Sequence, residues 1–145
     1  MGARQRRLCT RSRHQPHAGA GARALLQRVA REFGLAAAVL QDAAAMAARI
    51  RTGEGGWAWD AQAVDWAGNE VELHHEGELL RLDRLVRHRD GAWWVLDYKS
   101  AAQPEQDEDL LGQLRRYRRA VQAAHPGATV LAAFLTGQGR LVAVD

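Results

Sequence analysis

The sequence predicts one α/β domain of the α+β kind, with helices flanking a mixed, mostly antiparallel sheet. The chain has 145 residues, 47% of them hydrophobic, which suits a single domain with its own core. Apolar residues recur at helical spacing as far as Arg51, and from Glu70 the period changes to the alternation of strands. Glycine-containing turns separate these segments, so the expected order is α-α-β-β-β-α-β-β.

The two N-terminal helices are expected over residues 22–33 and 35–51, with a hinge at Gly34. The glycine-rich segment 53–56 ends the second helix. Three tryptophans follow in a segment expected to be irregular, and they are expected to pack against the core rather than to bind a ligand: Trp57, Trp59 and Trp66.

Strands are expected over residues 70–75, 79–87, 92–99, 129–135 and 140–144, and a helix over residues 107–124. The pairs Glu76-Gly77 and Asp90-Gly91 supply the glycine that tight turns need, so the first three strands form an antiparallel meander. The helix has one apolar stripe and acidic residues in its first turn, where the helix dipole favours them.

Composition excludes several classes of protein. No apolar run approaches the ~18 residues of a membrane helix. The single cysteine, Cys9, cannot form an internal disulfide, and no Cys/His cluster has the spacing of a zinc site. The chain also lacks a phosphate-binding loop, so any ATPase must lie elsewhere. These features favour a reducing compartment, the cytoplasm.

Charge is distributed unevenly along the chain. Residues 1–31 hold eight arginines and no acid, whereas the remainder has 12 basic against 17 acidic residues, a net charge of −5. We expect residues 1–19 to form an Arg-rich disordered arm and residues 20–145 to form the folded domain. The arm could be a transit peptide, a nucleic-acid-binding segment or the start of a truncated reading frame, of which the last is favoured.

The chemistry concentrates in the second and third expected strands. Asp97 and Lys99 are two residues apart and share a strand face, at about 6.6 Å along the chain. A three-residue loop at 89–91 would pair His88 with Ala92. That register places Asp83 opposite Asp97, with carboxylates about 5 Å apart in apolar surroundings.

Two opposed carboxylates need a cation between them, and Mg²⁺ is a suitable one because it binds few carboxylates and keeps several waters. Lys99 would then lie beside the metal, where an ammonium can orient or deprotonate water and stabilise a phosphate. Lys99 is the only lysine among 20 Lys and Arg residues. A guanidinium cannot lose its proton, so catalysis would explain this exception. A buried salt bridge of Lys99 with either aspartate is the alternative.

Three segments carry a family resemblance: Leu82-Asp83-Arg84-Leu85-Val86, Trp94-Val95-Leu96-Asp97-Tyr98-Lys99-Ser100 and Gln113-Leu114-Arg115-Arg116-Tyr117. They resemble the PD-(D/E)xK nuclease domain at the C-terminus of RecB/AddA-type helicase-nucleases, over residues 18–144. The resemblance implies a restriction-endonuclease-like core, a Mg²⁺- or Mn²⁺-dependent deoxyribonuclease, and a role in DNA repair and recombination. A single-strand exonuclease and a UvrD/Rep-type helicase partner are implied in the same way.

The resemblance also implies individual roles. Asp83, Asp97 and the backbone carbonyl of Tyr98 would bind the metal, Lys99 would be the base or electrostatic stabiliser, and Glu70 the upstream acid. Glu72, on the same expected strand, is the less favoured candidate for this third acid. Three helix residues would contact DNA: Gln113, Tyr117 and Arg116. Gln113 and Tyr117 share a helix face, although core packing of Tyr117 is an alternative.

One departure from the family pattern bears on activity. Arg23 stands where the family's first helix commonly has a metal-approaching histidine. A catalytically inactive remnant that docks on a helicase complex is therefore the alternative function.

Overall fold

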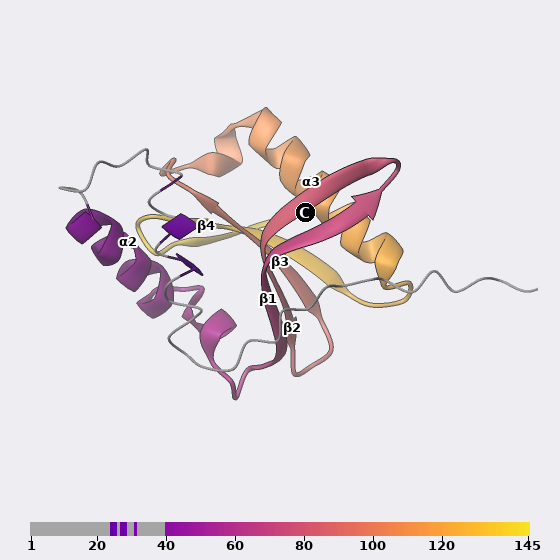
Figure 1. The fold of residues 1–145 in the computed structure, drawn as a ribbon, viewed down its shortest axis with the longest axis horizontal. Coiled ribbons are helices and arrows are strands. Elements are labelled where there is room, and N and C mark those ends of the chain that lie inside the picture. Colours follow the sequence, from indigo (N-terminus) through magenta and orange to yellow (C-terminus); the bar gives the residue numbers. More distant parts are fainter. Residues whose placement is uncertain (1–23, 26, 29–30, 32–39) are drawn as a thin grey trace, which may run out of the picture.

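The structure is a computed structural model that describes residues 24–25, 27–28, 31 and 40–145 (Figure 1). The described positions between 24 and 31 are helical. The elements that follow are α2 (Leu40–Thr52), β1 (Val64–His75), β2 (Glu78–His88), β3 (Trp93–Lys99), α3 (Glu108–Ala124), β4 (Val130–Thr136) and β5 (Leu141–Val144). Two short 3-10 turns, Gly56–Trp59 and Pro104–Gln106, precede β1 and α3.

The described strands form one sheet of five in the order β1-β2-β3-β4-β5. Neighbouring strands are antiparallel except β3 and β4, which run parallel. The parallel pair is possible because α3 returns the chain from the end of β3 to the start of β4. This architecture confirms the predicted mixed, mostly antiparallel sheet flanked by helices.

The turn between β2 and β3 sets the register that later positions the site. The His88 N–H donates to the Ala92 carbonyl at 2.8 Å, and Gly91 has φ +94°. Glycine adopts this backbone conformation without the clash of a Cβ atom. The three-residue loop predicted at 89–91 is thus confirmed, together with the pairing of His88 and Ala92.

Each face of the sheet has its own hydrophobic core, and α2 and α3 lie on opposite sides of it (Figure 1). On the α3 side, Leu85, Val95 and Phe134 pack against Leu114 and Val121. On the α2 side, the core contains Ala43, Ala47, Ile50, Val86, Leu96, Tyr98, Ala133 and Leu135. Because residues of β3 alternate between the two cores, Val95 and Asp97 share the face covered by α3.

The boundaries of α3 follow from its sequence. The Asp107 carboxylate caps the helix by accepting hydrogen bonds from the N–H groups of Asp109 and Leu110, at 3.0 and 3.2 Å. Such caps satisfy N–H groups that have no partner inside the helix. Beyond His125 the helix meets Pro126, which cannot continue it.

Two expectations about the first half of the domain were wrong. β1 begins at Val64 rather than at residue 70, and Trp66 lies within this strand rather than in an irregular segment. Gly68 and Asn69 interrupt the alternation of apolar residues and so hide the strand in the sequence. The structure also shows a register shift between Val64 and Trp66, at the start of the β1–β2 pairing.

The predicted end of the helix over 35–51 is confirmed within one residue, because α2 ends at Thr52 before Gly53. Residues 1–19, Arg23 and the hinge at Gly34 lie outside the described residues. Among the described helices, none is long and apolar enough to cross a membrane.

Candidate active site

The site lies where β2 and β3 stop pairing through their backbones. The ladder between them runs from Arg87–Trp93 to Arg84–Leu96. Asp83 and Asp97 are next in this register, and in place of a further ladder bond the Asp83 Oδ2 accepts the N–H of Tyr98 at 2.9 Å. The gap between the strands therefore holds carboxylates, as the predicted register requires.

Asp83 and Asp97 are both deeply buried, at 6% and 3% exposure. Burial, the charge of Asp97 and a hydrogen bond between the two carboxyl groups raise the pKa of Asp83 from 3.8 to about 7. The Tyr98 N–H and Arg28 favour the ionised form but do not outweigh these effects. Burial is the largest of these causes, so ionisation of Asp83 is disfavoured unless a cation lies close to it.

Lys99, the last residue of β3, is 9% exposed and faces the same side of the sheet as Asp97. Its Nζ lies 2.9 Å from Asp97 Oδ2 and 3.4 Å from the side-chain oxygen of Gln113 on α3. The second contact connects the strand to the helix above it. The ammonium is held next to the carboxylate pair, where it can act on a group bound there.

Glu70 lies on β1 level with Asp83, since its neighbours Asn69 and Val71 pair with Arg84 and Leu82. Its backbone has φ +49°, which breaks the side-chain alternation of β1 at this point. Its carboxylate forms an ion pair with Arg31. Glu70 is therefore close to the site along the sheet, but its side chain is bound to the N-terminal helix.

Arg28 is a site contact that the sequence analysis missed. Its guanidinium lies 2.8 Å from Asp83 Oδ1, while its Nε is buried and has no hydrogen-bond partner among the described residues. Arg28 and Arg31 are three residues apart on one helix and pair with Asp83 and Glu70 respectively. Their i, i+3 spacing in a predicted helix was the available signal.

The helix α3 contributes Gln113 and Tyr117 to the site but orients Arg116 elsewhere. Tyr117 is buried, and burial together with the charges of Asp97 and Asp83 raises its pKa. Arg116 is exposed and its Nη1 lies 3.4 Å from a carboxylate oxygen of Glu78, at the start of β2. Tyr117 thus lies within electrostatic reach of both aspartates, whereas Arg116 pairs with Glu78, five residues before Asp83 on β2.

The backbone of Tyr98 faces the gap between β2 and β3. Its N–H points toward β2, and in a strand the carbonyl of a residue points to the same side as its N–H. The Lys99 carbonyl points the other way, toward β4, where it accepts the Gly137 N–H at 3.3 Å. The Tyr98 carbonyl oxygen is therefore directed at the gap that holds Asp83.

A buried aromatic and arginine layer supports the site from the α2 side. The Trp59 and Tyr98 rings stack at 6.5 Å, and the Arg84 guanidinium lies 4.5 Å from the centre of the Trp59 ring. Arg84 also donates to Asn69 at 2.6 Å and to the Ala58 carbonyl at 2.7 Å. These contacts hold Arg84, the residue after Asp83 on β2, and Tyr98, the residue after Asp97 on β3.

The donor set fits a hard divalent cation. Asp97 Oδ2 is buried and accepts no hydrogen bond within the described part of the chain, although Lys99 is its ion-pair partner. With Asp83 Oδ1 and the Tyr98 carbonyl, it makes an all-oxygen set of the type that Mg²⁺ prefers. Across the described residues, no group of three or more His, Cys, Asp and Glu side chains is arranged around a common metal position. Two carboxylates and a carbonyl are therefore the candidate ligands that the described residues offer here.

Comparison with known proteins agrees with this geometry. A family profile of the PD-(D/E)XK nuclease superfamily matches residues 4–142. No curated protein matches the chain. The profile covers nearly the whole sequence, including both aspartates and the lysine, and the fold is the mixed sheet with flanking helices expected for it. The chain belongs to the PD-(D/E)XK nuclease superfamily.

Proposed function

We propose that this chain is the nuclease domain of a RecB/AddA-type helicase-nuclease, and that it degrades single-stranded DNA from its ends in repair and recombination. The observation that supports the proposal most strongly is the buried group of Asp83, Asp97 and Lys99 where β2 and β3 separate. Buried like charges are costly. A protein retains such an arrangement when a ligand, here Mg²⁺ or Mn²⁺, completes it.

Each member of the group has a chemical task in phosphodiester hydrolysis. Asp83, Asp97 and the Tyr98 carbonyl would hold the divalent cation, which polarises the phosphoryl oxygen and offsets its developing charge. The Lys99 ammonium orients the attacking water and stabilises the phosphate, or in its neutral form takes the proton of that water. The water oxygen bonds to phosphorus and gives its proton to Lys99 or to solvent, the P–O bond to the leaving group breaks, and the leaving oxygen takes a proton from solvent. Glu70 is proposed as an upstream acid, which requires its release from Arg31.

The DNA is proposed to contact Gln113 and Tyr117 beside the acids, and also Arg116, which is exposed and would have to leave Glu78. The chain after residue 31 has a net charge of −5, so positive surface must come from elsewhere. The Arg-rich residues 1–19, proposed as an arm preceding a domain over 20–145, and a UvrD/Rep-type helicase are the candidate sources. Binding should therefore weaken steeply with salt.

The second candidate function is a catalytically inactive docking module of a helicase complex. The observation that favours it is the arginine pair: Arg28 lies on Asp83 and Arg31 on Glu70. Guanidinium groups neutralise these acids in place, which a permanently metal-free domain would need. The cytoplasm is the proposed location under both functions.

Activity on three labelled substrates separates these candidates: linear single-stranded DNA, closed circular single-stranded DNA and linear RNA of the same sequence. The full chain is incubated with Mg²⁺, with Mn²⁺ or with a chelator, beside Lys99→Ala and the exposed control Arg81→Ala. We expect metal-dependent loss of linear DNA, which Arg81→Ala retains and Lys99→Ala abolishes. Cleavage of circles would show an endonuclease, and no cleavage by a folded chain would exclude the nuclease proposal and favour the inactive docking module.

A further inference from the structure

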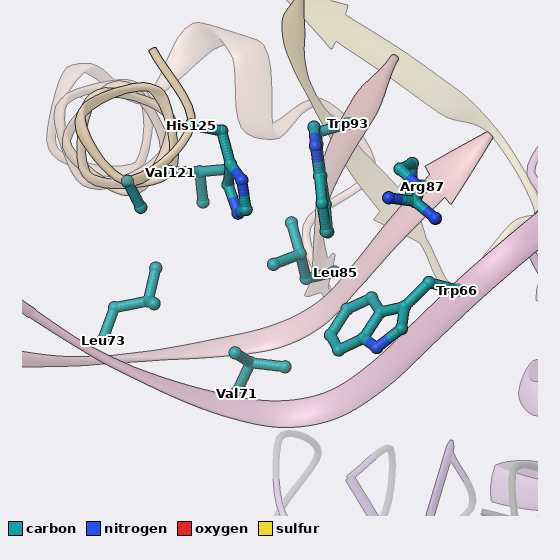
Figure 2. A pocket seen from close by; sticks show the side chains of 9 residues that line it. Trp66, Val71, Leu73, Leu85, Arg87, Trp93, Val121 and His125 are labelled. Atoms are coloured by element: carbon teal, nitrogen blue, oxygen red, sulfur yellow. The ribbon is translucent and has the colours of Figure 1, made fainter. Parts of the chain in front are cut away.

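A cavity of about 280 Å³ lies between the sheet and the C-terminal half of α3. Its floor consists of buried apolar residues, among them Leu73, Leu85 and Val121. Figure 2 shows these side chains with the three rings that reach the cavity from separate elements: Trp66 from β1, Trp93 from β3 and His125 at the end of α3. Trp66 and His125 are only partly buried, so the cavity has an accessible rim above a buried floor.

Two of the rings are already stacked on each other, and the Arg87 guanidinium lies 5.6 Å from the centre of the Trp93 ring on its other side (Figure 2). Trp93 and His125 lie nearly parallel, with centroids 4.2 Å apart and an interplanar angle of 20°. Trp66 is tilted against Trp93 at 5.5 Å. Burial and the charge of Arg87 lower the pKa of His125, which favours its uncharged form. Trp66, partly buried at the rim, is the ring that remains to stack on a planar ligand, and such stacking needs no charge.

The polar groups of the cavity favour an anionic chain over a cationic ligand. Among the described residues that line it, Arg87 and His125 have polar side chains and none is Asp or Glu. Asp65 pairs with Arg87 Nε at 2.7 Å from outside the lining. A cationic ligand would meet Arg87, whereas a neutral planar ring attached to a phosphate chain would not be repelled.

The cavity adjoins the candidate active site along α3. Tyr117, Val121 and His125 follow one another at four-residue intervals, so Val121 is about 6 Å and His125 about 12 Å along the helix from Tyr117. On the sheet, Trp93 and Asp97 share a face of β3, about 13 Å apart. These spans are short enough for one nucleotide strand to occupy both places.

We propose that this cavity receives one base of the substrate strand, close to the bond that is cleaved, and stacks it on the ring of Trp66 at its rim, beside the stacked pair of Trp93 and His125. A base can enter only when it is unstacked from a duplex, so the cavity would give the enzyme its preference for single strands. The inference rests on the proposed function, because it assumes that DNA is the substrate.

Binding of single-stranded oligo(dT) to the full chain tests the inference. Ca²⁺ replaces Mg²⁺ in the binding assay, and cleavage with Mg²⁺ is measured on the same preparations. A series of strands, each with one abasic position, locates the base that matters. We expect one position at which loss of the base weakens binding by about 5- to 100-fold, the range of stacking on an aromatic side chain.

Trp66→Leu and Trp57→Leu form a matched pair, because both tryptophans are partly buried but Trp57 packs on the α2 side. Trp66→Leu should weaken binding of the intact strand, and it should bind the strand that lacks the critical base as tightly as the intact one. The salt dependence of binding should not change, since no phosphate contact is lost. Trp57→Leu should change none of these, and Trp66→Phe should restore stacking. If Trp66→Leu fails to fold, His125→Ala removes another ring that lines the cavity, at the partly exposed end of α3.

Several outcomes overturn the inference. The cavity does not hold a base if all strands with one abasic position bind equally, or if Trp66→Leu and Trp57→Leu weaken DNA binding by the same factor. Cleavage of DNA by the same samples would leave the proposed function standing. Unchanged DNA binding by Trp66→Leu with loss of a helicase interaction shows that the cavity holds a protein side chain. A folded chain that neither binds nor cleaves DNA overturns both proposals.

Discussion

The Tyr98 N–H donates a hydrogen bond to Asp83 Oδ2 at 2.9 Å, so a side-chain carboxylate replaces a strand carbonyl where β2 and β3 separate. The bond fixes Asp83 toward Asp97 and directs the Tyr98 carbonyl into the same gap. A structural bond and a candidate metal ligand thus share one carboxylate. Substitutions that preserve the acceptor but remove the charge can separate these two roles.

Asp83→Asn is such a substitution. The pKa of Asp83 is raised to about 7 in the folded chain, so between about pH 4 and 7 the folded state binds a proton that the unfolded state has lost. The stability of the metal-free protein therefore falls as pH rises through this window. Asn keeps an acceptor for the Tyr98 N–H and does not ionise, so the variant should gain stability relative to the parent from acid to neutral pH.

Urea unfolding in chelator, at several pH values, measures this difference. Added Mn²⁺ should stabilise the parent more than Asp83→Asn. Stability curves of the two proteins that run parallel from about pH 4 to 7 would show that Asp83 has no raised pKa.

Arg28→Met should strengthen metal binding. The Arg28 guanidinium lies 2.8 Å from Asp83 Oδ1, and its charge opposes a second cation at that oxygen. Removing it should lower the Kd for Mn²⁺ by about 3- to 10-fold, the effect of roughly 1 kcal/mol. Isothermal titration of the full chain measures the change, with Arg81→Met as a control because Arg81 is exposed and pairs only with the exposed Glu72 among the described residues. A weaker or unchanged affinity would show that Arg28 does not compete with the metal.

Arg84→Ala should destabilise the fold. The guanidinium is buried against Trp59 and donates to Asn69 and to the Ala58 carbonyl, which would lose their donor. Loss of charged hydrogen bonds with buried acceptors left behind costs about 2–4 kcal/mol. Urea unfolding should show this loss, while exposed Arg81→Ala should stay within about 0.5 kcal/mol of the parent. Equal losses in the free energy of unfolding for the two variants would mean that the Arg84 contacts with Trp59, Asn69 and Ala58 do not stabilise the fold.

Gln113→Ala tests the position of Lys99. Gln113 is the α3 residue whose side-chain oxygen lies 3.4 Å from Lys99 Nζ. If this contact positions the ammonium, the variant should lower kcat about 10-fold, in addition to any rise in KM from the proposed DNA contact, with little change in the free energy of unfolding. A change confined to KM would show that Gln113 contacts DNA but does not position Lys99.

The contacts of the site that depend on residues close together in the chain could be predicted from sequence, whereas the contacts between distant segments could not. The register of Asp83 with Asp97 depends on a three-residue turn with Gly91 at positive φ, which is local information. Arg28 and Arg31 reach the acids only through the packing of the N-terminal helix on the sheet, which no local pattern specifies. The start of β1 was missed because Gly68, Asn69 and the positive φ of Glu70 break the alternation on which strand prediction relies.

The central claim is that Asp83 and Asp97 hold a divalent cation that Lys99 uses to cleave DNA. The most direct test compares the initial rate of Mg²⁺-dependent cleavage of single-stranded DNA by the full chain with that of Asp97→Asn and of the exposed control Glu72→Gln, together with Mn²⁺ binding of each. We predict that Asp97→Asn loses both binding and cleavage, by at least about 100-fold in rate, while Glu72→Gln retains both. Cleavage that survives in Asp97→Asn, or Mn²⁺ binding that is equal in all three proteins, would contradict the claim.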